Sequence, residues 1–380
     1  MVLETGPSSG DITSVSEAID LLTSNKFLED IKPPKQPKSG DIDFGLWFRG
    51  HSSKSHVLVP SALRDSLAQT NRYLDEVSMV RHFRAMNCDV VASDATDFEV
   101  QVTMQHYLAP TRLLDWTENL LVAVHFAVRD AVNDDKDAAL WVLNARRLNY
   151  YTSVSSRKSE VLFENELDVL ARSCLIRVRN RQEWLDVLNR LLRTRVIDKE
   201  EYRVDRVLRA INTVKLLGEQ VNDSLASPID LRNLQVVVRN RVAQKDLTRD
   251  WATPEMLDIR LRSPVAVYPN RANRRIRAQS GCFTLHGGKF IPNPETYVTG
   301  KLYPTPIGLP ISLHEIHNSL KLKRGQILKW FRIPSGRQSE IRRTLARIGI
   351  TDASLFPELD YQSRYLHKRW TTDQAEPEEE

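Results

Sequence analysis

Two short stretches, LWFRGH at residues 46–51 and QHYLAPTRLLDWTENLLVAVHFA at residues 105–127, carry most of the information about the fold. The first is a short aromatic segment followed by glycine, which is typical of a β-strand that ends near Gly50. In the second, residues 111–117 are expected to be extended. Residues 118–132 are an apolar run long enough for a deeply packed helix.

Other parts of the chain also show helix or strand patterns. Ser14 and Thr117 are candidate N-caps for the helices that follow them. Apolar spacing and strand-forming residues predict helices at 15–31, 72–86, 98–107 and 339–350, strands at 138–145, 265–270, 281–287 and 326–333, and a loop or short turn after 57–63. The expected fold class is α+β, with a small mixed or antiparallel sheet and packed helices.

The residue pattern changes in the middle of the chain. From about residue 160 to 248, Leu, Val and Arg recur at helical spacing with few strand signals, which predicts an insertion of three to five helices. The expected organisation is an N-terminal helix and linker at 1–39, a first half-domain at 40–160, the helical insertion at 161–248, a second half-domain at 249–367 and an acidic disordered tail at 368–380.

Composition limits the class of protein. Of the 380 residues, 41% are hydrophobic and 27% charged, as in a globular chain. No run of about 18 apolar residues is present, and the N-terminus lacks the features of a secretory signal. The three cysteines form no CxxC pair. We therefore expect a soluble cytoplasmic protein without a membrane partner, and the net charge of +5 permits contact with phosphates without requiring it.

Arg49 is the first candidate for a functional residue. A guanidinium group is a rigid fork that stays charged and binds phosphate or carboxylate through two donors. Gly50, next to it, lets the backbone turn sharply or lets a ligand come close. The alternative is that Arg49 is structural and pairs with a buried acid.

A second cluster of polar residues precedes the apolar helix. It contains Gln105, His106, Tyr107, Thr111, Arg112, Asp115 and Trp116. Buried polar groups need partners, since each unpaired one costs about 1–3 kcal/mol. Arg112 and Asp115 could form an internal pair, and Trp116 could be core. His106 is the residue of this group that can change charge near neutral pH.

Taken together, these motifs resemble the FRG domain, a family named for the tripeptide found here at residues 48–50. The shared pattern includes LWFRGH, LVPSALRD, QHYLAPTRLLDWTENLLVAVHFAV and RIRAQSGCFTLHG, and it spans about residues 40–360 outside the helical stretch. The chain departs from the family at His51, where members commonly have Gln, and at Leu108, where Gly is frequent. The resemblance implies a fold unit and a site but no particular reaction.

A weaker similarity, at the level of the fold, links the pattern to ADP-ribosyltransferases. It implies that Arg49 contacts NAD and that a third element carries a catalytic Glu. Gln279 stands at that third position. A glutamine cannot act as the carboxylate that stabilises an oxocarbenium-like centre. The assignment as a transferase, with NAD as its cofactor, therefore stays open.

The first functional hypothesis is a polar pocket for a nucleotide-like or phosphate-bearing ligand, in a toxin-like or phage-defence effector. Arg49 and Arg112 would hold phosphates, His106 or Tyr107 would orient the ligand, and Asp115 would fix Arg112 or His106. The proposed catalytic set is Arg49, His106, Arg112 and Gln279, with Tyr107, Thr111, Asp115, Trp116 and Gly50 as binding residues and no metal ligands.

Two hypotheses without catalysis are also supported by the sequence. The basic stretches 271–277 and 324–332 have aromatic neighbours and could contact the nucleic-acid backbone. A solvated charged face is the alternative explanation for them. The helical stretch 161–248 could instead dock a protein partner, in which case the polar cluster would be structural.

Overall fold

A computed structural model provides the structure. It describes residues 8–31, 45–67, 74–130, 136–153, 161–164, 169, 172–173, 261–292, 304–308, 313–314, 316 and 327–371. The predicted helical insertion lies largely outside these residues, as do residues 372–380 of the predicted acidic tail. In the part of the chain that the structure describes, no helix has the length and apolar character needed to cross a bilayer.

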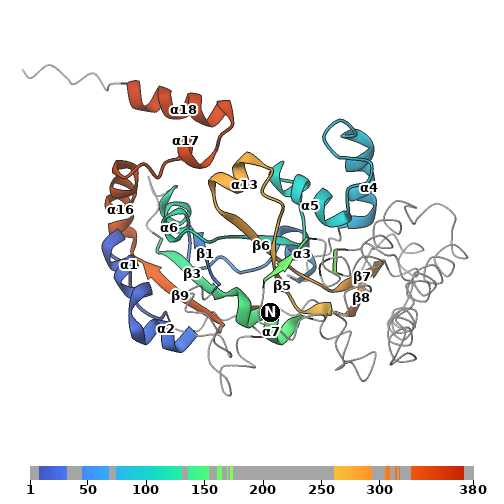
Figure 1. Cartoon of the computed structure of the whole chain (residues 1–380), viewed down its shortest axis with the longest axis horizontal. Helices are drawn as coiled ribbons and strands as arrows, with labels where there is room; N and C mark the ends of the chain where they lie inside the picture. The colour runs from blue at the N-terminus through green and yellow to red at the C-terminus, as the bar shows by residue number, and fades with distance from the viewer. Residues whose placement is uncertain are drawn as a thin grey trace, which may run out of the picture.

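The fold is α+β, as the sequence predicts, and Figure 1 shows helices packed around a central sheet. The helices are α1 (Val15–Thr23), α2 (Asn25–Ile31), α3 (Ser61–Leu67), α4 (Glu76–Met86), α5 (Asp97–His106), α6 (Leu120–Val128), α7 (Ala145–Thr152), α13 (Arg274–Ala278), α16 (Ser335–Arg347), α17 (Asp352–Leu355) and α18 (Leu359–Trp370).

The main sheet has seven strands in the order β4-β5-β6-β2-β1-β3-β9. Its strands are β1 (Leu46–His51), β2 (Leu113–Thr117), β3 (Ala138–Asn144), β4 (Leu162–Phe163), β5 (Val265–Tyr268), β6 (Gly281–Leu285) and β9 (Leu328–Ile333), and β7 (Lys289–Pro292) pairs with β8 (Pro304–Gly308) in a second small sheet. Only the β4–β5 pair in the main sheet is parallel, so the sheet is mixed.

Both faces of the central strands are covered, which explains their apolar sequences. All seven residues of β3 are buried. Because side chains alternate along a strand, Val142 belongs to the core cluster shared with α6, α1 and α16, whereas Trp141 belongs to the cluster on the opposite face. On β1, Phe48 and Trp47 divide between the two faces in the same way. A strand covered on both sides has no polar face to show in its sequence.

Several predicted boundaries differ from the structure. The helix expected at 15–31 is divided at Ser24 into α1 and α2, and Ser14 caps it as predicted by accepting from the backbone of Glu17. Asn119, not Thr117, is the N-cap of α6. Local capping chemistry allowed either residue, because the sequence pattern does not fix the first turn.

Two further differences concern whole elements. The loop or short turn expected after residues 57–63 is instead helix α3, which begins at Ser61. Helix α18 was not predicted, and it carries the exposed residues Leu359, Leu366 and Trp370.

Gly50 allows α6 to approach the centre of the sheet. A Cβ atom built at Gly50 would lie 2.0 Å from the carbonyl oxygen of Ala123 and 2.5 Å from the amide nitrogen of Ala127. Both are backbone atoms of α6 and cannot move aside independently. The glycine in this tripeptide is therefore required by helix–strand packing, a reason that the sequence did not suggest.

Candidate functional site

The central sheet parts beside β1. Strands β1 and β2 are paired at Phe48–Thr117 alone, whereas β1 pairs with β3 along its whole length. A cavity of about 340 Å³ lies at this divergence. Its lining includes consecutive residues from both strands, 48–51 and 115–117, together with residues of α5, α6 and the α13–β6 segment. The topology thus forms a pocket between the two halves of the sheet.

Arg49 lies at the point where the strands separate. Its Nη1 donates to the main-chain oxygen of Asp115 at 2.6 Å and lies 3.6 Å from the Asp115 carboxylate. Its Nε donates to Nε2 of His51 at 2.9 Å. Within the described residues, Nη2 of Arg49 has no hydrogen-bond partner, and the side chain is 17% exposed. The guanidinium is therefore fixed on two sides and retains an available donor in the cavity wall.

His51 holds Arg49 as a neutral acceptor. Burial, together with the charges of Arg49 and His56, lowers the pKa of His51 to about 2. The ring is consequently neutral at physiological pH, and Nε2 can accept the Arg49 hydrogen bond. A glutamine at this position would offer a side-chain oxygen able to accept the same bond.

Asp115 and Gln105 form a second oriented polar group. Gln105 Nε2 donates to the Asp115 carboxylate at 2.9 Å, and Thr111 donates its hydroxyl proton to Gln105 Oε1. Asp115 is 55% exposed in its side chain, so it presents a held acceptor to the cavity. The sequence had suggested that Asp115 would fix Arg112 or His106, but its partners in the structure are Arg49 and Gln105.

His106 stands at the edge of the cavity, where α5 ends. Burial and the neighbouring charge of Arg275 lower the pKa of His106, while Glu358 opposes that shift. Its Nε2 lies 3.7 Å from Oε1 of Glu358. Arg275 Nη1 donates to the main-chain oxygen of His106 at 3.4 Å. The residue is therefore placed among charged groups at the mouth of the site.

Gln279 follows α13 as its C-cap and also lines the cavity. Its main-chain oxygen accepts from the hydroxyl of Thr117 at 2.6 Å, which ties α13 to β2. Its side-chain amide donates to the main-chain oxygen of Leu355 at 3.1 Å. The residue thus joins three parts of the chain around the cavity.

The structure brings together six of the nine residues singled out from the sequence. The cavity is lined by Arg49, Gly50, His106, Asp115, Trp116 and Gln279. Trp116 is nonetheless largely core, since it is 3% exposed and donates Nε1 to Thr284 at 3.1 Å.

Arg112, Tyr107 and Thr111 are absent from the cavity lining. Arg112 is 3% exposed and makes two hydrogen bonds, of 2.7 and 2.6 Å, to the Glu76 carboxylate, so its role in the structure is a buried ion pair. Tyr107 is 58% exposed, beyond the rim of the cavity. Thr111 is buried and orients Gln105 from behind.

Arg275 is the site residue that the sequence analysis missed. It lines the cavity, and its guanidinium stacks over the ring of Phe356, 4.5 Å from the centroid. Arg275 precedes Gln279 by four residues, a spacing that places both on one helical face. That spacing was the available signal. Among the described residues, no group of three or more His, Cys, Asp or Glu is arranged to hold a metal ion.

Residues 45–136 match the family model of the FRG domain, and this part of the chain is an FRG domain. The matched segment contains Arg49, Gln105, His106 and Asp115. Arg275 and Gln279, which also line the cavity, follow it in the chain.

Two curated relatives are similar over a limited part of their length. The magnesium transport protein CorA of Campylobacter jejuni (strain RM1221) is 29% identical over 135 residues, covering 29% of this chain and 41% of that protein. CorA of Campylobacter jejuni subsp. jejuni serotype O:2 is 28% identical over the same length. The chain thus spans less than half the length of these relatives. No solved structure matches significantly.

Proposed function

We propose that the chain binds a small phosphate-bearing, nucleotide-like ligand in the cavity between β1 and β2. The observation that carries the proposal is the geometry of Arg49, which is fixed by His51 and Asp115 and keeps Nη2 available. A guanidinium immobilised before the ligand arrives loses little side-chain freedom on binding. It also recognises phosphate through directed hydrogen bonds.

The charge of the cavity supports an anionic ligand. Two arginines, Arg49 and Arg275, line it against one carboxylate, that of Asp115. The pKa of His51 is lowered to about 2, and that of His106 is also lowered. Both rings are therefore neutral at neutral pH and do not change the net charge of the cavity. An excess of fixed positive charge in a partly enclosed site favours anions.

The rest of the lining supports a ligand that also has an apolar, planar part. Phe48, Phe126 and Phe283 contribute apolar surface, and Asp115 with Gln105 offers an oriented hydrogen-bonding pair. Sites that bury small ligands commonly have volumes of roughly 300–1,000 Å³ and combine apolar walls with a few placed polar groups. A nucleoside phosphate satisfies each of these features: its phosphate suits Arg49, and its sugar or base suits the acceptors.

We do not extend the proposal to ADP-ribosyl transfer or to magnesium transport. Gln279 stands where the transferase pattern requires a carboxylate, and its amide is engaged with Leu355. The similarity to CorA covers 41% of that protein.

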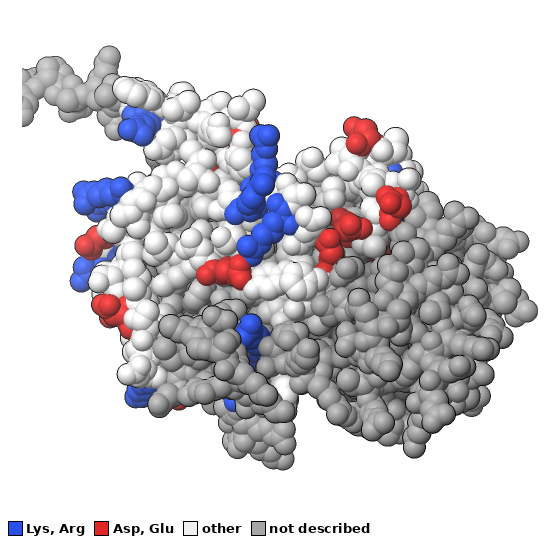
Figure 2. All heavy atoms as spheres, in the orientation of Figure 1, with Lys and Arg blue, Asp and Glu red and all other residues white. Residues whose placement is uncertain are grey.

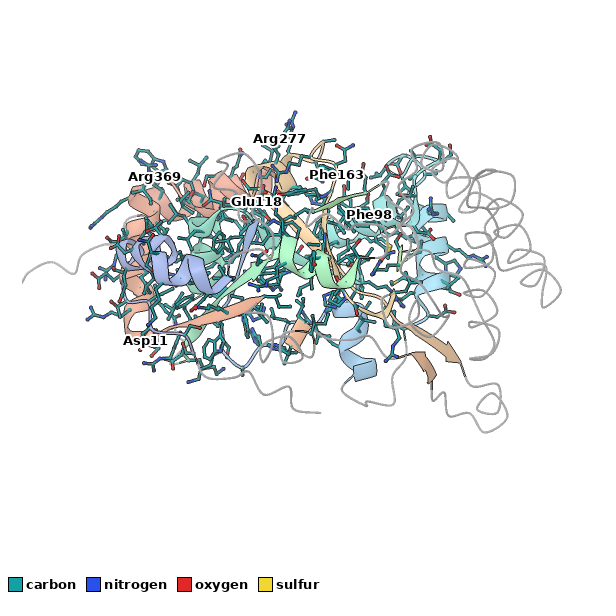
Figure 3. The ribbon with its side chains drawn as sticks, turned by 60° about the horizontal axis from the view of Figure 1, so that its bottom comes forward. Asp11, Phe98, Glu118, Phe163, Arg277 and Arg369 are labelled. Atoms are coloured by element: carbon teal, nitrogen blue, oxygen red, sulfur yellow. The ribbon has the colours of Figure 1, made fainter. Side chains whose placement is uncertain are left out.

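The proposal is tested by measuring thermal stabilisation of the full chain by inorganic phosphate, AMP, ADP, GMP and NAD. At least one nucleotide should raise the Tm of the wild type, and Arg49→Gln should abolish that shift. Arg277→Gln is the matched control, because this exposed arginine lies on α13 and points away from the ribbon (Figure 3). Equal Tm shifts for the wild type and Arg49→Gln would contradict the proposal.

Nucleic-acid binding is the second candidate, and one observation favours it. Figure 2 shows basic side chains gathered over α13, where Arg274 and Arg277 are exposed beside the mouth of the cavity. Arg271, from the same basic stretch, is paired with Glu118. A nucleic-acid complex should weaken steeply with salt. It should also be weakened by Arg274→Gln and Arg277→Gln while Arg49→Gln leaves it intact, the reverse of the result expected for the cavity.

A further inference from the structure

A single C-terminal segment contacts three residues at the mouth of the cavity. Leu355, at the end of α17, accepts the amide proton of Gln279 through its main-chain oxygen. Phe356 lies under the guanidinium of Arg275, and Glu358 places its carboxylate 3.7 Å from Nε2 of His106. The three contacts come from four consecutive positions. The segment is therefore seated against the cavity mouth.

The carboxylate of Glu358 is poorly satisfied in this position. Its Oε1 lies 3.7 Å from His106, which is too long for a hydrogen bond. Its Oε2 is buried, with no hydrogen-bond partner among the described residues. A carboxylate oxygen removed from water without a partner is costly. The contact is consequently weaker than the one a well-placed anion could make with the same groups.

Arg275, also at the cavity mouth, has N–H donors that are not used in hydrogen bonds to the described residues. Within the described residues, its side chain makes one hydrogen bond, of 3.4 Å, to the main-chain oxygen of His106, and no ion pair. The guanidinium has five N–H donors in a fixed fork. Its Cζ lies 4.5 Å from the centroid of the Phe356 ring, and this contact restrains the position of the group. The Arg275 guanidinium is therefore positioned to bind an anion, and no carboxylate of the described residues forms an ion pair with it.

We propose that Arg275 and His106 form a second anion subsite at the cavity mouth, and that Glu358 occupies it in the absence of ligand. This inference rests on the proposed function, since Arg49 and Arg275 would hold two anionic groups of one ligand. The ligand class is then narrowed to molecules with two such groups, such as a nucleoside diphosphate. Glu358 acts as a competitor that the second phosphate displaces.

The anchoring of the segment allows this exchange. Asp352 binds Nε2 of His125 at 3.0 Å and Nε of Arg129 at 3.2 Å, and Leu355 and Phe356 pack with Val122 of α6. These contacts lie before Glu358 in the chain. Beyond it, α18 exposes Leu359 and Trp370 at 79% and 77% of their surfaces. Tyr361 of α18 stacks on Phe356 with ring centroids 4.3 Å apart, so the helix stays attached. The Glu358 side chain is 31% exposed and can turn away from His106 while these contacts persist.

The test is calorimetric titration of the full chain with ADP and with AMP. Glu358→Gln removes the competing charge with little change in size, so ADP should bind about 3- to 10-fold more tightly to it than to the wild type, with AMP affinity unchanged. Arg275→Gln should remove the preference for ADP over AMP. Asp360→Asn is the matched control, because this neighbouring carboxylate on α18 pairs with Arg364 and not with the cavity.

The outcomes separate this inference from the proposed function. If Arg49→Gln loses both nucleotides while Glu358→Gln and Arg275→Gln keep the wild-type ratio of ADP to AMP affinity, the cavity remains and the second subsite is refuted. If neither nucleotide binds to the wild type or to Glu358→Gln, both proposals are refuted. Hydrogen exchange provides an independent readout: ADP should speed exchange in residues 358–366, and unchanged or slower exchange there would contradict displacement of Glu358.

Discussion

Nη1 of Arg49 donates a hydrogen bond of 2.6 Å to the main-chain oxygen of Asp115, at the place where β1 and β2 separate. In a continuous sheet, that oxygen would accept from a backbone amide of the neighbouring strand. The side chain of Arg49 thus replaces a sheet hydrogen bond and satisfies the backbone at the divergence. The same contact fixes the guanidinium toward the cavity, so the architecture of the sheet and the candidate binding group depend on each other.

The support of Arg49 by His51 should depend on an acceptor at position 51. His51→Gln keeps an acceptor within reach of Arg49 Nε, and we expect nearly wild-type stability and nucleotide binding. His51→Leu leaves the Nε donor buried without a partner, which should cost about 1–3 kcal/mol in the free energy of unfolding and weaken binding. Urea unfolding and calorimetry measure the two effects. Equal behaviour of the two variants would contradict the role of this hydrogen bond.

Stability should fall as the pH is lowered below about 6.5. The pKa values of His51 and His286 are lowered from 6.5 to about 2 and about 3 by burial and neighbouring arginines. Between those values and 6.5 the unfolded chain binds protons that the folded chain does not, so unfolding is favoured by acid. In His51→Gln, the slope of unfolding free energy against pH between pH 4 and 6 should fall by about 1.4 kcal/mol per pH unit. An unchanged slope would contradict this assignment.

Gly50 and Gly336 provide a matched pair of glycine substitutions. A Cβ at Gly50 would collide with the backbone of α6, whereas one at Gly336, exposed on α16, meets nothing within 4 Å. Gly50→Ala should destabilise the domain by at least about 3 kcal/mol, since neither backbone can yield alone. Gly336→Ala should stabilise it by about 0.5–1 kcal/mol through helix propensity. Thermal unfolding compares them, and a tolerated Gly50→Ala would refute the close approach of α6.

Leu108 has a left-handed backbone conformation, which favours glycine. Its φ is 64°, and its side chain is 83% exposed. A left-handed conformation costs a non-glycine residue about 1–2 kcal/mol. Leu108→Gly should therefore raise the free energy of unfolding by about 1 kcal/mol after the entropy of the unfolded glycine is subtracted. Leu108→Ala keeps the left-handed conformation of a non-glycine residue and should show no such gain. An equal gain in stability in both variants would contradict the role of backbone strain and would point to the exposed leucine side chain as the cause.

Arg112 should affect stability and not binding. Removing one partner of a buried pair leaves an uncompensated charge, so Arg112→Met should cost about 3–5 kcal/mol because Glu76 remains. The double variant Arg112→Met with Glu76→Gln should recover part of this loss. The folded fraction of either variant should bind nucleotide as the wild type does. If a well-folded Arg112→Met variant lost nucleotide affinity, the result would contradict this prediction and would indicate that Arg112 contributes to binding.

The secondary structure around the site could be predicted because its signals are local. The aromatic strand at 46–51, the extended segment before α6 and the apolar run of α6 itself each show a clear periodicity, and the structure confirms them. The reason for Gly50 could not be predicted, since it depends on how closely α6 approaches β1. Neither could the gap between β1 and β2, because strand pairing beyond one residue pair is set by the whole sheet.

The sequence indicated which segments form the site better than it indicated which individual residues line the cavity. Arg112 looked equivalent to Arg49 in sequence, yet its partner Glu76 lies 36 residues earlier, and no local pattern reveals that pairing. Arg275 was quoted as part of a motif without being recognised as part of the cavity. Burial and long-range partners, not residue type, decide which arginine faces a ligand.

Arg49 is proposed to hold the anionic group of a nucleotide in the cavity. The most direct measurement is the dissociation constant of ADP for the wild type, Arg49→Gln and Arg277→Gln, obtained by calorimetry at fixed ionic strength. Loss of a charge-assisted contact should weaken ADP binding by about 10- to 100-fold in Arg49→Gln and leave Arg277→Gln unchanged. Equal affinity of the wild type and Arg49→Gln, or no ADP binding by the wild type, would contradict the claim.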